Sequence, residues 1–196
     1  MKIITLSGKS ASGKDLLYRK LLEKHKELRP VVAHTTRPMR SKETDGVEYH
    51  FVDRRSMNDL IAIGEIFEHR TYSTEEGEWI YGTSLSEIDV NSDNVYIAIV
   101  DLDGLQAYRE AFGTDNIISY YIEANDGIRL VRALKRETGF SDKKKDELIR
   151  RFFSDDLEFR RASNLCLYTL KNNTYDDLEE CIETIGYEVK RCADGV

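Results

Sequence analysis

The chain has 196 residues, of which 40% are hydrophobic and 33% are charged. This length and composition are typical of a soluble globular protein with one core and room for a small inserted lobe. The formal net charge of −7 argues against a nucleic-acid partner, because no basic face outweighs the acidic residues.

The sequence shows no sign of a targeting or membrane segment. The apolar run after Met1 and Lys2 is too short for a signal peptide, and no stretch is long enough to cross a bilayer. The cysteines, Cys166, Cys181 and Cys192, are unevenly spaced and include no C-x-x-C pair, so we expect free thiols. These features predict a cytoplasmic protein without a membrane partner.

The first predicted elements are a strand, a glycine-rich loop and a helix. An apolar run at residues 3–6 predicts a buried strand, and leucines at helical spacing over residues 16–28 predict a helix. Between them, residues 8–14 read Gly-Lys-Ser-Ala-Ser-Gly-Lys and fit the phosphate-binding pattern G-x-x-x-x-G-K. A strand that leads through glycines into a helix leaves N–H groups unpaired at the positive end of the helix dipole, which together form an anion site.

The loop therefore predicts a site for the phosphates of a nucleoside triphosphate, with Lys14 reaching the outer ones. Position 15 departs from the pattern, because Asp15 stands where Ser or Thr normally offers a hydroxyl to Mg²⁺. A carboxylate is also a hard oxygen ligand, so we expect Mg²⁺ with an unusual set of ligands. The residues predicted to bind the triphosphate are Gly8, Lys9, Ser10, Ala11, Ser12, Gly13, Lys14 and Asp15.

Further along the chain, apolar runs alternate with helical patterns. Alternation of strands and helices predicts an α/β fold with a mainly parallel sheet and helices on both faces. The predicted strands are residues 31–33, 95–100, 117–122 and 165–170, and the predicted helices are residues 105–112, 128–134 and 178–185.

Two segments depart from this alternation. Residues 36–90 contain three short predicted strands (49–52, 66–72 and 78–81) around one helix (56–63), which we interpret as a small α+β lobe inserted into the core. A second long helical pattern at residues 143–161 follows a polar stretch, residues 137–142, whose composition is typical of a loop.

Residues 34–51 contain a second group of side chains suited to phosphate. Arg37 and Arg40 lie three apart, and Pro38 between them stiffens the chain. Guanidinium groups suit bidentate phosphate binding, although two arginines in a polar loop are also common on solvated surfaces. A carboxylate can accept hydrogen bonds from both N1 and N2 of guanine, a donor pair that adenine lacks. Glu68 or Asp103 could supply it.

Together these motifs resemble the guanylate kinase family, and the resemblance runs over nearly the whole chain. The stretch 35–40 (Thr-Thr-Arg-Pro-Met-Arg) is similar to the start of the family's GMP-binding signature. Residues 81–83 (Tyr-Gly-Thr) are similar to its Tyr-Gly-Ser/Thr turn, and residues 100–103 end a strand where the family has an acidic pair. The remaining positions of the signature are Glu43, Gly46, Tyr49 and Phe51.

The resemblance implies a P-loop kinase fold and transfer of the γ-phosphoryl group of ATP to GMP, giving ADP and GDP. It implies small-molecule nucleotides as partners of a monomer or homodimer, and Mg²⁺ as cofactor with Asp15 and Asp101 as metal ligands. Of the GMP-binding residues, Arg37, Arg40 and Tyr49 would hold the phosphate, and Glu68, Thr83 and Asp103 would lie near the base. The full set implied to bind GMP is Arg37, Arg40, Glu43, Tyr49, Glu68, Tyr81, Thr83 and Asp103.

The resemblance also implies how a single domain, residues 1–196, is organised. Arg132, Arg136 and Arg151 fall on the family's lid arginines and, with Lys14, are the implied catalytic residues. Arginines that close over a transferring phosphoryl group stabilise its charge and exclude water. The implied parts are a core (1–35, 91–131 and 162–190), a GMP-binding lobe (36–90) and a helical lid (132–161).

Three features depart from the family pattern. Asp15 replaces the hydroxyl residue, and the segment between Glu68 and Tyr81 is longer than usual. Ala33-His34 stands where the family commonly has serine, so His34 is either a ligand contact or a hydrogen-bonded histidine at a strand end.

Two other functions stay open on the sequence alone. A ribose 1,5-bisphosphate phosphokinase is one, because that family resembles guanylate kinases and carries Gly-Lys-Asp in its loop, as residues 13–15 do here. The complete set Arg37, Arg40, Glu43 and Tyr49 instead favours a nucleoside monophosphate. The other is an inactive guanylate-kinase-like module that binds a partner protein, against which the retained Lys14 and lid arginines argue.

Overall fold

The structure is a computed structural model and describes residues 1–41, 43–74, 77–136 and 142–194. Its main sheet has five parallel strands in the order β2-β7-β1-β8-β9. Parallel strands are buried on both faces, which is why their sequences are continuous apolar runs. The strands are β1 (Lys2–Ser7), β2 (Leu28–Pro30), β7 (Val95–Ile99), β8 (Ile117–Glu123) and β9 (Tyr168–Lys171).

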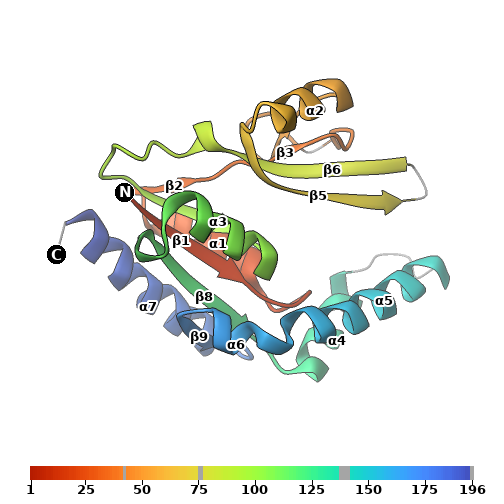
Figure 1. Ribbon diagram of the computed structural model, residues 1–196. Helices are drawn as coiled ribbons and strands as arrows, with labels where there is room; N and C mark the ends of the chain where they lie inside the picture. Colours follow the sequence, from red (N-terminus) through yellow and green to blue (C-terminus); the bar gives the residue numbers. More distant parts are fainter. Residues whose placement is uncertain (42, 75–76, 137–141, 195–196) are drawn as a thin grey trace.

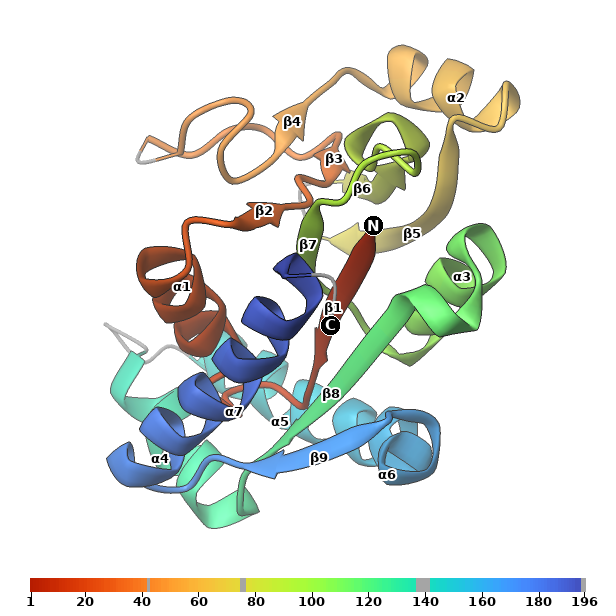
Figure 2. The same cartoon turned by 90° about the vertical axis from the view of Figure 1, so that its left-hand side faces the viewer.

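Helices cover both faces of this sheet. Figure 2 shows α1 (Lys14–Lys24) and α7 (Tyr175–Ala193) on one side and α3 (Leu102–Phe112) on the other. Successive residues of β1 point to opposite faces, so Ile4 and Leu6 belong to the core beneath α1 and α7, and Ile3 belongs to the core beneath α3.

A second, four-stranded mixed sheet forms a small lobe above the main sheet (Figure 1). Its strands, in the order β4-β3-β6-β5, are β3 (His34–Thr35), β4 (His50–Phe51), β5 (Ile66–Thr74) and β6 (Gly77–Ser84). Helix α2 (Arg54–Ala62) buries Met57 against Ile66 and Ile80 of this sheet. We call α2 and these four strands, with their connections, the small lobe.

The small lobe contacts the main body through an aromatic cluster. The ring of Phe67 on β5 packs edge-on against Tyr108 and Phe112 of α3, with centroids 4.9 and 5.1 Å apart. Such pairs are favourable beyond the apolar area that they bury.

Helices α4 (Asp126–Arg136) and α5 (Asp142–Glu158) lie beside the carboxyl end of β1 (Figures 1 and 2). The chain then continues through Phe159–Arg161 and α6 (Ala162–Leu165) into β9. Two further 3-10 turns, Leu85–Glu87 and Thr114–Asn116, precede β7 and β8. Most of the predicted loop 137–142 lies outside the described residues.

The predicted α/β architecture is confirmed, with four local corrections. The small lobe has four strands and not the predicted three, because His34–Thr35 (β3), just before the predicted start of the lobe at residue 36, pairs with both β4 and β6. Residues 31–33 are not a strand, because the chain leaves β7 for the second sheet after Pro30, and the Val31 N–H makes the last hydrogen bond to Ile97 O at 3.0 Å. The predicted strand 165–170 begins only at Tyr168, since Leu165 completes α6 and the Leu167 N–H bonds to the Ser119 hydroxyl. The predicted helix 16–28 ends at Lys24, because His25 is already extended.

The predicted free thiols are confirmed, because Cys166, Cys181 and Cys192 form no disulfide. Among the described helices, none is both long and apolar enough to span a membrane.

Candidate active site

The phosphate-loop residues connect β1 to α1 through two left-handed backbone positions. Gly13 has φ 94° and Ala11 has φ 61°. Glycine adopts such angles without cost, whereas alanine is strained by them. Gly8 has no room for a side chain, because a Cβ there would lie 2.7 Å from the carbonyl oxygen of Ile122. The loop is therefore tightly wound and held close to β8.

This winding leaves donors available at the start of α1. The N–H groups of Ala11, Gly13, Lys14 and Asp15 have no acceptor among the described residues, while the Ser12 N–H bonds to Lys9 O at 3.1 Å. Unpaired N–H groups at a helix N-terminus, together with the helix dipole, attract phosphate. The structure thus brings the predicted anion site together.

The charged side chains of the loop point in different directions. Lys14 lies at the start of α1, with its Nζ 3.8 Å from a carboxylate oxygen of the exposed Asp15. Lys9 instead pairs with Asp156 of α5 at 2.5 Å and lies 3.8 Å from Asp126 of α4. Lys14 is therefore the lysine of the loop that has its charge available for a phosphate.

In the small lobe, Arg37 is the most buried of the predicted phosphate ligands. Its side chain is 4% exposed, and its Nη2 donates to Glu43 Oε1 at 2.7 Å. The other carboxylate oxygen of Glu43 accepts the backbone N–H of Arg40 at 2.8 Å. Hydrogen bonds from Arg37 and Arg40 hold the pKa of Glu43 below its ordinary value. Glu43 thus orders the loop that carries both arginines, and the Arg40 side chain is left exposed.

Aromatic rings surround Arg37. Its guanidinium carbon lies 5.6 Å from the ring centroids of both Tyr49 and Phe51, within the range of a cation–π contact. Tyr81 packs edge-on against Tyr49 and against Tyr72, with centroids 5.6 Å apart in each case. Burial raises the pKa of Tyr49, so its hydroxyl stays a hydrogen-bond donor at neutral pH. The predicted residues Arg37, Glu43, Tyr49 and Tyr81 therefore form one group.

Glu68 and Thr83, which were predicted to lie near the base, contact each other. Glu68 on β5 accepts a hydrogen bond from the hydroxyl of the buried Thr83 on β6 at 2.7 Å. Burial is the main cause that raises the pKa of Glu68, and the nearby negative charge of Asp101 adds to it. The second oxygen of this carboxylate, Oε2, lies near Gly104 at the start of α3. Glu68 is thus a half-buried carboxylate held by its neighbour, with one oxygen left to accept.

The predicted acidic pair has a partner that the sequence did not reveal. Arg70 on β5 lies 2.9 Å from Asp101 and 2.5 Å from Asp103, both at the start of α3, and 3.9 Å from Glu158 of α5. The second oxygen of Asp101 caps α3 through the Gly104 N–H at 2.7 Å. Arg70 therefore joins the small lobe to the main body. The signal available in the sequence was a cation two residues after Glu68 on the same face of a strand.

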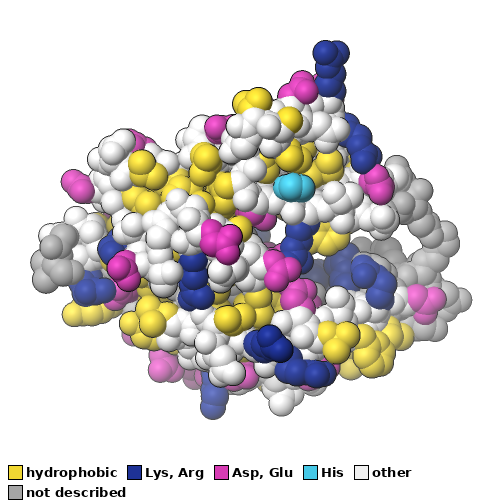
Figure 3. All heavy atoms as spheres, in the orientation of Figure 1, with side chains coloured by type: hydrophobic (Ala, Val, Ile, Leu, Met, Phe, Trp, Pro, Cys, Tyr) yellow, Lys and Arg dark blue, Asp and Glu magenta, His cyan; other side chains and the backbone are white. Residues whose placement is uncertain are grey.

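One face of the molecule carries a depression. On the face drawn in Figure 3, the surface is hollowed between the small lobe and α5, and basic and acidic side chains gather around the hollow. A charged hollow of this kind suits a charged ligand better than an apolar one.

The three predicted lid arginines have different environments. Arg132 on α4 donates to three backbone carbonyls, those of Ser12 at 3.2 Å, Asn172 at 2.8 Å and Asn173 at 3.1 Å. Arg136 ends α4 and is exposed, and Arg151 is exposed on α5. The structure thus ties Arg132 to the phosphate loop, whereas Arg136 and Arg151 stay predicted lid residues.

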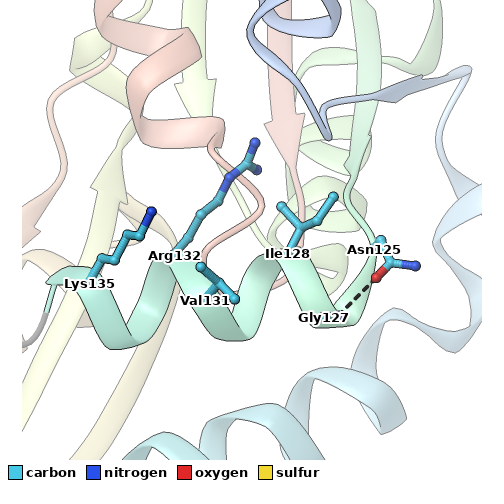
Figure 4. A pocket seen from close by; sticks show the side chains of 6 residues that line it. All are labelled: Asn125, Gly127, Ile128, Val131, Arg132 and Lys135. Atoms are coloured by element: carbon cyan, nitrogen blue, oxygen red, sulfur yellow. Dashed lines mark hydrogen bonds between the residues drawn. The ribbon is translucent and has the colours of Figure 1, made fainter.

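A cavity of about 490 Å³ lies along α4 next to Arg132. Figure 4 shows the Arg132 side chain reaching past this cavity toward the phosphate loop, with Lys135 one helical turn away. No residue predicted to bind the monophosphate lines it. The lining residues are Asn125, Gly127, Ile128, Val131, Arg132 and Lys135.

Asn172 is a second residue that the sequence did not reveal. It is 2% exposed, follows β9 and donates from Nδ2 to the Ser12 carbonyl at 2.9 Å. Because the carboxyl ends of parallel strands share one edge of the sheet with the loop, a polar residue just after a predicted strand was the available signal.

His34 was predicted to be either a ligand contact or a hydrogen-bonded histidine. Its ring packs on that of His50 with centroids 4.7 Å apart, and His50 pairs with Glu87 at 3.0 Å. Nδ1 of His34 is buried without a hydrogen-bond partner among the described residues. Burial lowers the pKa of His34, with a contribution from His50, so its ring favours the neutral form.

Comparisons with known proteins agree with this geometry. A family model described as guanylate kinase matches residues 1–185. A guanylate kinase of Homo sapiens is 28% identical over 192 residues, covering 96% of this chain and 94% of that protein. A guanylate kinase of Nostoc sp. is 38% identical over 113 residues, covering 57% of this chain and 55% of that protein. With several of the curated relatives, therefore, the match spans only about half of their length.

A solved structure agrees with the fold. The crystal structure of a guanylate kinase from Anaplasma phagocytophilum superposes with a TM-score of 0.69 at 22% identity, covering 96% of this chain and 84% of that one. At this level of identity the superposition supports the fold and not a particular activity.

Proposed function

Because the chain belongs to the guanylate kinase family, we propose that it transfers the γ-phosphoryl group of ATP to GMP, giving ADP and GDP. The observation that carries this proposal is the buried Arg37, held by Glu43 and packed on Tyr49, in a lobe that is separate from the phosphate loop. Two anion sites on two bodies suit a reaction between two phosphorylated substrates. In that reaction a phosphate oxygen of GMP forms a bond to the γ-phosphorus as the bond to the β–γ bridging oxygen breaks.

The donor triphosphate would bind at the phosphate loop. The N–H groups of Ala11, Gly13, Lys14 and Asp15 would donate to its oxygens, and the ammonium of Lys14 would offset the charge that develops on them. Such donors act without reorganising at the moment of reaction, because the loop is already wound into place.

Mg²⁺ fits the donor side through Asp15. This carboxylate is exposed at the start of α1, whereas both oxygens of Asp101 are engaged, one by Arg70 and one by the Gly104 N–H. Asp101 is therefore the less available of the two carboxylates, because each of its oxygens already accepts a hydrogen bond or ion pair. Bound Mg²⁺ would neutralise charge on the β- and γ-phosphate oxygens.

The acceptor would bind in the small lobe. Arg37, Arg40 and Tyr49 would hold the phosphate of GMP, with Tyr81 packed behind them. Glu68, fixed by Thr83, would accept hydrogen bonds from N1 and N2 of guanine. Glu68 is favoured over Asp103 because Glu68 is half-buried, whereas the side chain of Asp103 is 90% exposed and paired with Arg70.

A ribose 1,5-bisphosphate phosphokinase is the second candidate function, and Asp15 is the observation in its favour. An inactive binding module is the third candidate. The loop argues against it, since its donors and Lys14 remain in place.

The test is to follow ATP and ADP by phosphorus NMR with GMP, AMP or ribose 1,5-bisphosphate as acceptor. The proposal expects GDP formation with GMP and much slower turnover of AMP. Faster turnover of the ribose bisphosphate would favour the second candidate. No turnover of any acceptor, by a folded protein, would favour the binding module.

A further inference from the structure

Arg129 of α4 is a fully buried arginine that contacts the phosphate loop. Its exposed fraction is 0%, and its Nε donates to the carbonyl oxygen of Ser10 at 2.9 Å. Nη2 donates to Asp155 of α5 and Nη1 to Asp126, each at 2.5 Å. The guanidinium also lies 4.5 Å from the ring centroid of Phe152. Apart from Ser10 of the phosphate loop, these contacts involve no residue assigned to a substrate above.

Asp155 completes the arrangement from the other side. It is 8% exposed and accepts the backbone N–H of Ser10 at 2.8 Å and the Ser10 hydroxyl at 3.3 Å. Between them, Arg129 and Asp155 therefore form hydrogen bonds with the N–H, the hydroxyl and the carbonyl of Ser10.

These hydrogen bonds also fix the direction of the N–H of the next residue, Ala11. In a trans peptide the carbonyl of one residue and the N–H of the following residue point in opposite directions. When Arg129 draws the Ser10 carbonyl toward α4, the N–H of Ala11 must point away from α4. That N–H has no acceptor among the described residues, and Ala11 has the strained φ of 61°.

The carbonyl of Ser12, two residues later, is also held by side-chain donors. Arg132 and Asn172 both donate to the Ser12 carbonyl, at 3.2 and 2.9 Å, and the N–H of Gly13 is left without an acceptor in the described chain. Alternate carbonyls of the loop are thus drawn outward by side chains, and the N–H groups between them are turned the other way.

Stability alone does not explain a buried ion pair at this place. Desolvating two charges is costly, and well-packed apolar residues often replace such pairs without loss of stability. What apolar residues cannot do is hold the Ser10 peptide in one orientation against the strain at Ala11.

We propose that Arg129 and Asp155 are positioning residues for the donor nucleotide, which fix the Ser10–Ala11 peptide so that the Ala11 N–H meets a phosphate oxygen. This inference rests on the proposed function only in that ATP binds at the loop, and it does not depend on the acceptor. Because Asp155 lies on α5, the orientation of the loop also depends on where that helix packs.

Four variants of the full chain test the inference: Arg129→Met, Asp155→Leu, the double variant Arg129→Met/Asp155→Leu, and Arg129→Lys. Arg191→Met is the matched control, because Arg191 also pairs with a carboxylate three residues away, that of Glu188, but on α7. The measurements are the Kd for ATP with Mg²⁺ by calorimetry, without acceptor, and the Tm.

Each single variant takes the buried partner away from a buried charge, so we expect the Tm to fall by on the order of 10 °C. The double variant should regain most of that loss and still bind ATP about tenfold to a hundredfold more weakly, because the peptide is free to turn. Arg129→Lys keeps the charge but has one nitrogen for three partners, so it should bind ATP weakly as well. Arg191→Met should bind ATP like the parent.

A double variant or an Arg129→Lys variant that binds ATP as tightly as the parent would overturn the inference. So would a parent that does not bind ATP at all. A parent that binds ATP but does not phosphorylate GMP would contradict the proposed function and leave the positioning role intact.

Discussion

Beside the phosphate loop, the ion pair of Arg129 and Asp155 is buried and bonded to the backbone, whereas the charged contacts between the small lobe and the main body are partly exposed. The Arg129 side chain is fully buried and that of Asp155 is 11% exposed. The corresponding values for Arg70 and Asp103 are 29% and 90%. Exposed ion pairs are weak and screened by salt, while buried hydrogen-bonded groups fix a geometry.

The difference indicates two kinds of binding site. The loop is ordered before a ligand arrives, because Ser10 and Ser12 are each held by two side chains. The small lobe is ordered within itself by Arg37 and Glu43 but is joined to the body mainly by Phe67 and Arg70. We therefore expect the lobe to shift as a unit when its ligand binds.

The largest effect should come from the ordered loop. Lys14→Ala removes the loop's available charge, so phosphoryl transfer should fall by about 10³-fold or more. The Tm should stay near that of the parent, because Lys14 is paired only loosely with Asp15. Lys20→Ala is the control, since Lys20 lies on the same helix and pairs with Glu23 at its surface. Near-normal turnover by folded Lys14→Ala protein would contradict the kinase proposal.

Arg37→Ala is expected to have the next largest effect, in the small lobe. It removes a phosphate ligand and leaves Glu43 without its main partner, so kcat/KM for GMP should fall by about a hundredfold. The KM for ATP should change little, because the donor site is held separately. Arg40→Ala, which removes an exposed side chain, should have a smaller effect and should weaken every monophosphate alike. An equal loss of ATP binding in Arg37→Ala would show that the two sites are not independent.

Glu68→Gln should change the preference between bases. Glutamine keeps one acceptor oxygen but turns an NH2 group toward the second guanine donor. Leaving that donor without an acceptor costs about 1–3 kcal/mol, so the preference for GMP over AMP should fall about tenfold to a hundredfold. Asp103→Asn, measured beside it, should leave that preference nearly unchanged because Asp103 is held by Arg70. The reverse result would assign base recognition to Asp103.

The same carboxylate predicts a dependence on pH. Burial raises the pKa of Glu68 above its unfolded value, so between these two values the folded protein binds the extra proton. Stability should therefore fall as pH rises through that window, and Glu68→Gln should lose this slope. Use of GMP needs the ionised form, so the acid limb of kcat/KM should lie above the ordinary glutamate pKa of about 4.3.

The smallest effect should come from the contact between lobe and body. Arg70→Ala removes a partly exposed cation, so the KM for GMP should change only a few-fold, and less at high salt. Arg54→Ala is the control, because its ion pair with Glu78 at 2.7 Å lies within the lobe. A loss as large as that of Arg37→Ala would mean that Arg70 touches the substrate.

The sequence predicts those parts of the site that lie in continuous local motifs. The loop of residues 8–15 and the stretch from Arg37 to Tyr49 are continuous, so their geometry follows from neighbouring residues. Glu68 and Thr83 are paired by the hairpin of β5 and β6. The roles assigned to these residues in binding nucleotides stay predictions.

The partners that the sequence did not reveal are distant along the chain. Arg129 and Asp155 lie 26 residues apart, on two helices whose packing no local pattern specifies. The pattern around Arg129 is typical of a polar position on an amphipathic helix, and that around Arg70 is typical of a solvated cation on a strand. The wrongly placed strand at residues 31–33 has a similar cause, because an apolar run does not show that the strand lies at Leu28–Pro30 and that the chain leaves the sheet after Pro30.

Hydrogen–deuterium exchange measured with ATP alone and with GMP alone tests most directly the claim that an ordered donor site and a movable acceptor lobe bind separate substrates. We predict that GMP slows exchange across residues 36–90 and leaves residues 8–15 nearly unchanged, and that ATP slows exchange at residues 8–15 without affecting the lobe. Protection of residues 8–15 by GMP, with no change in the lobe, would contradict this account.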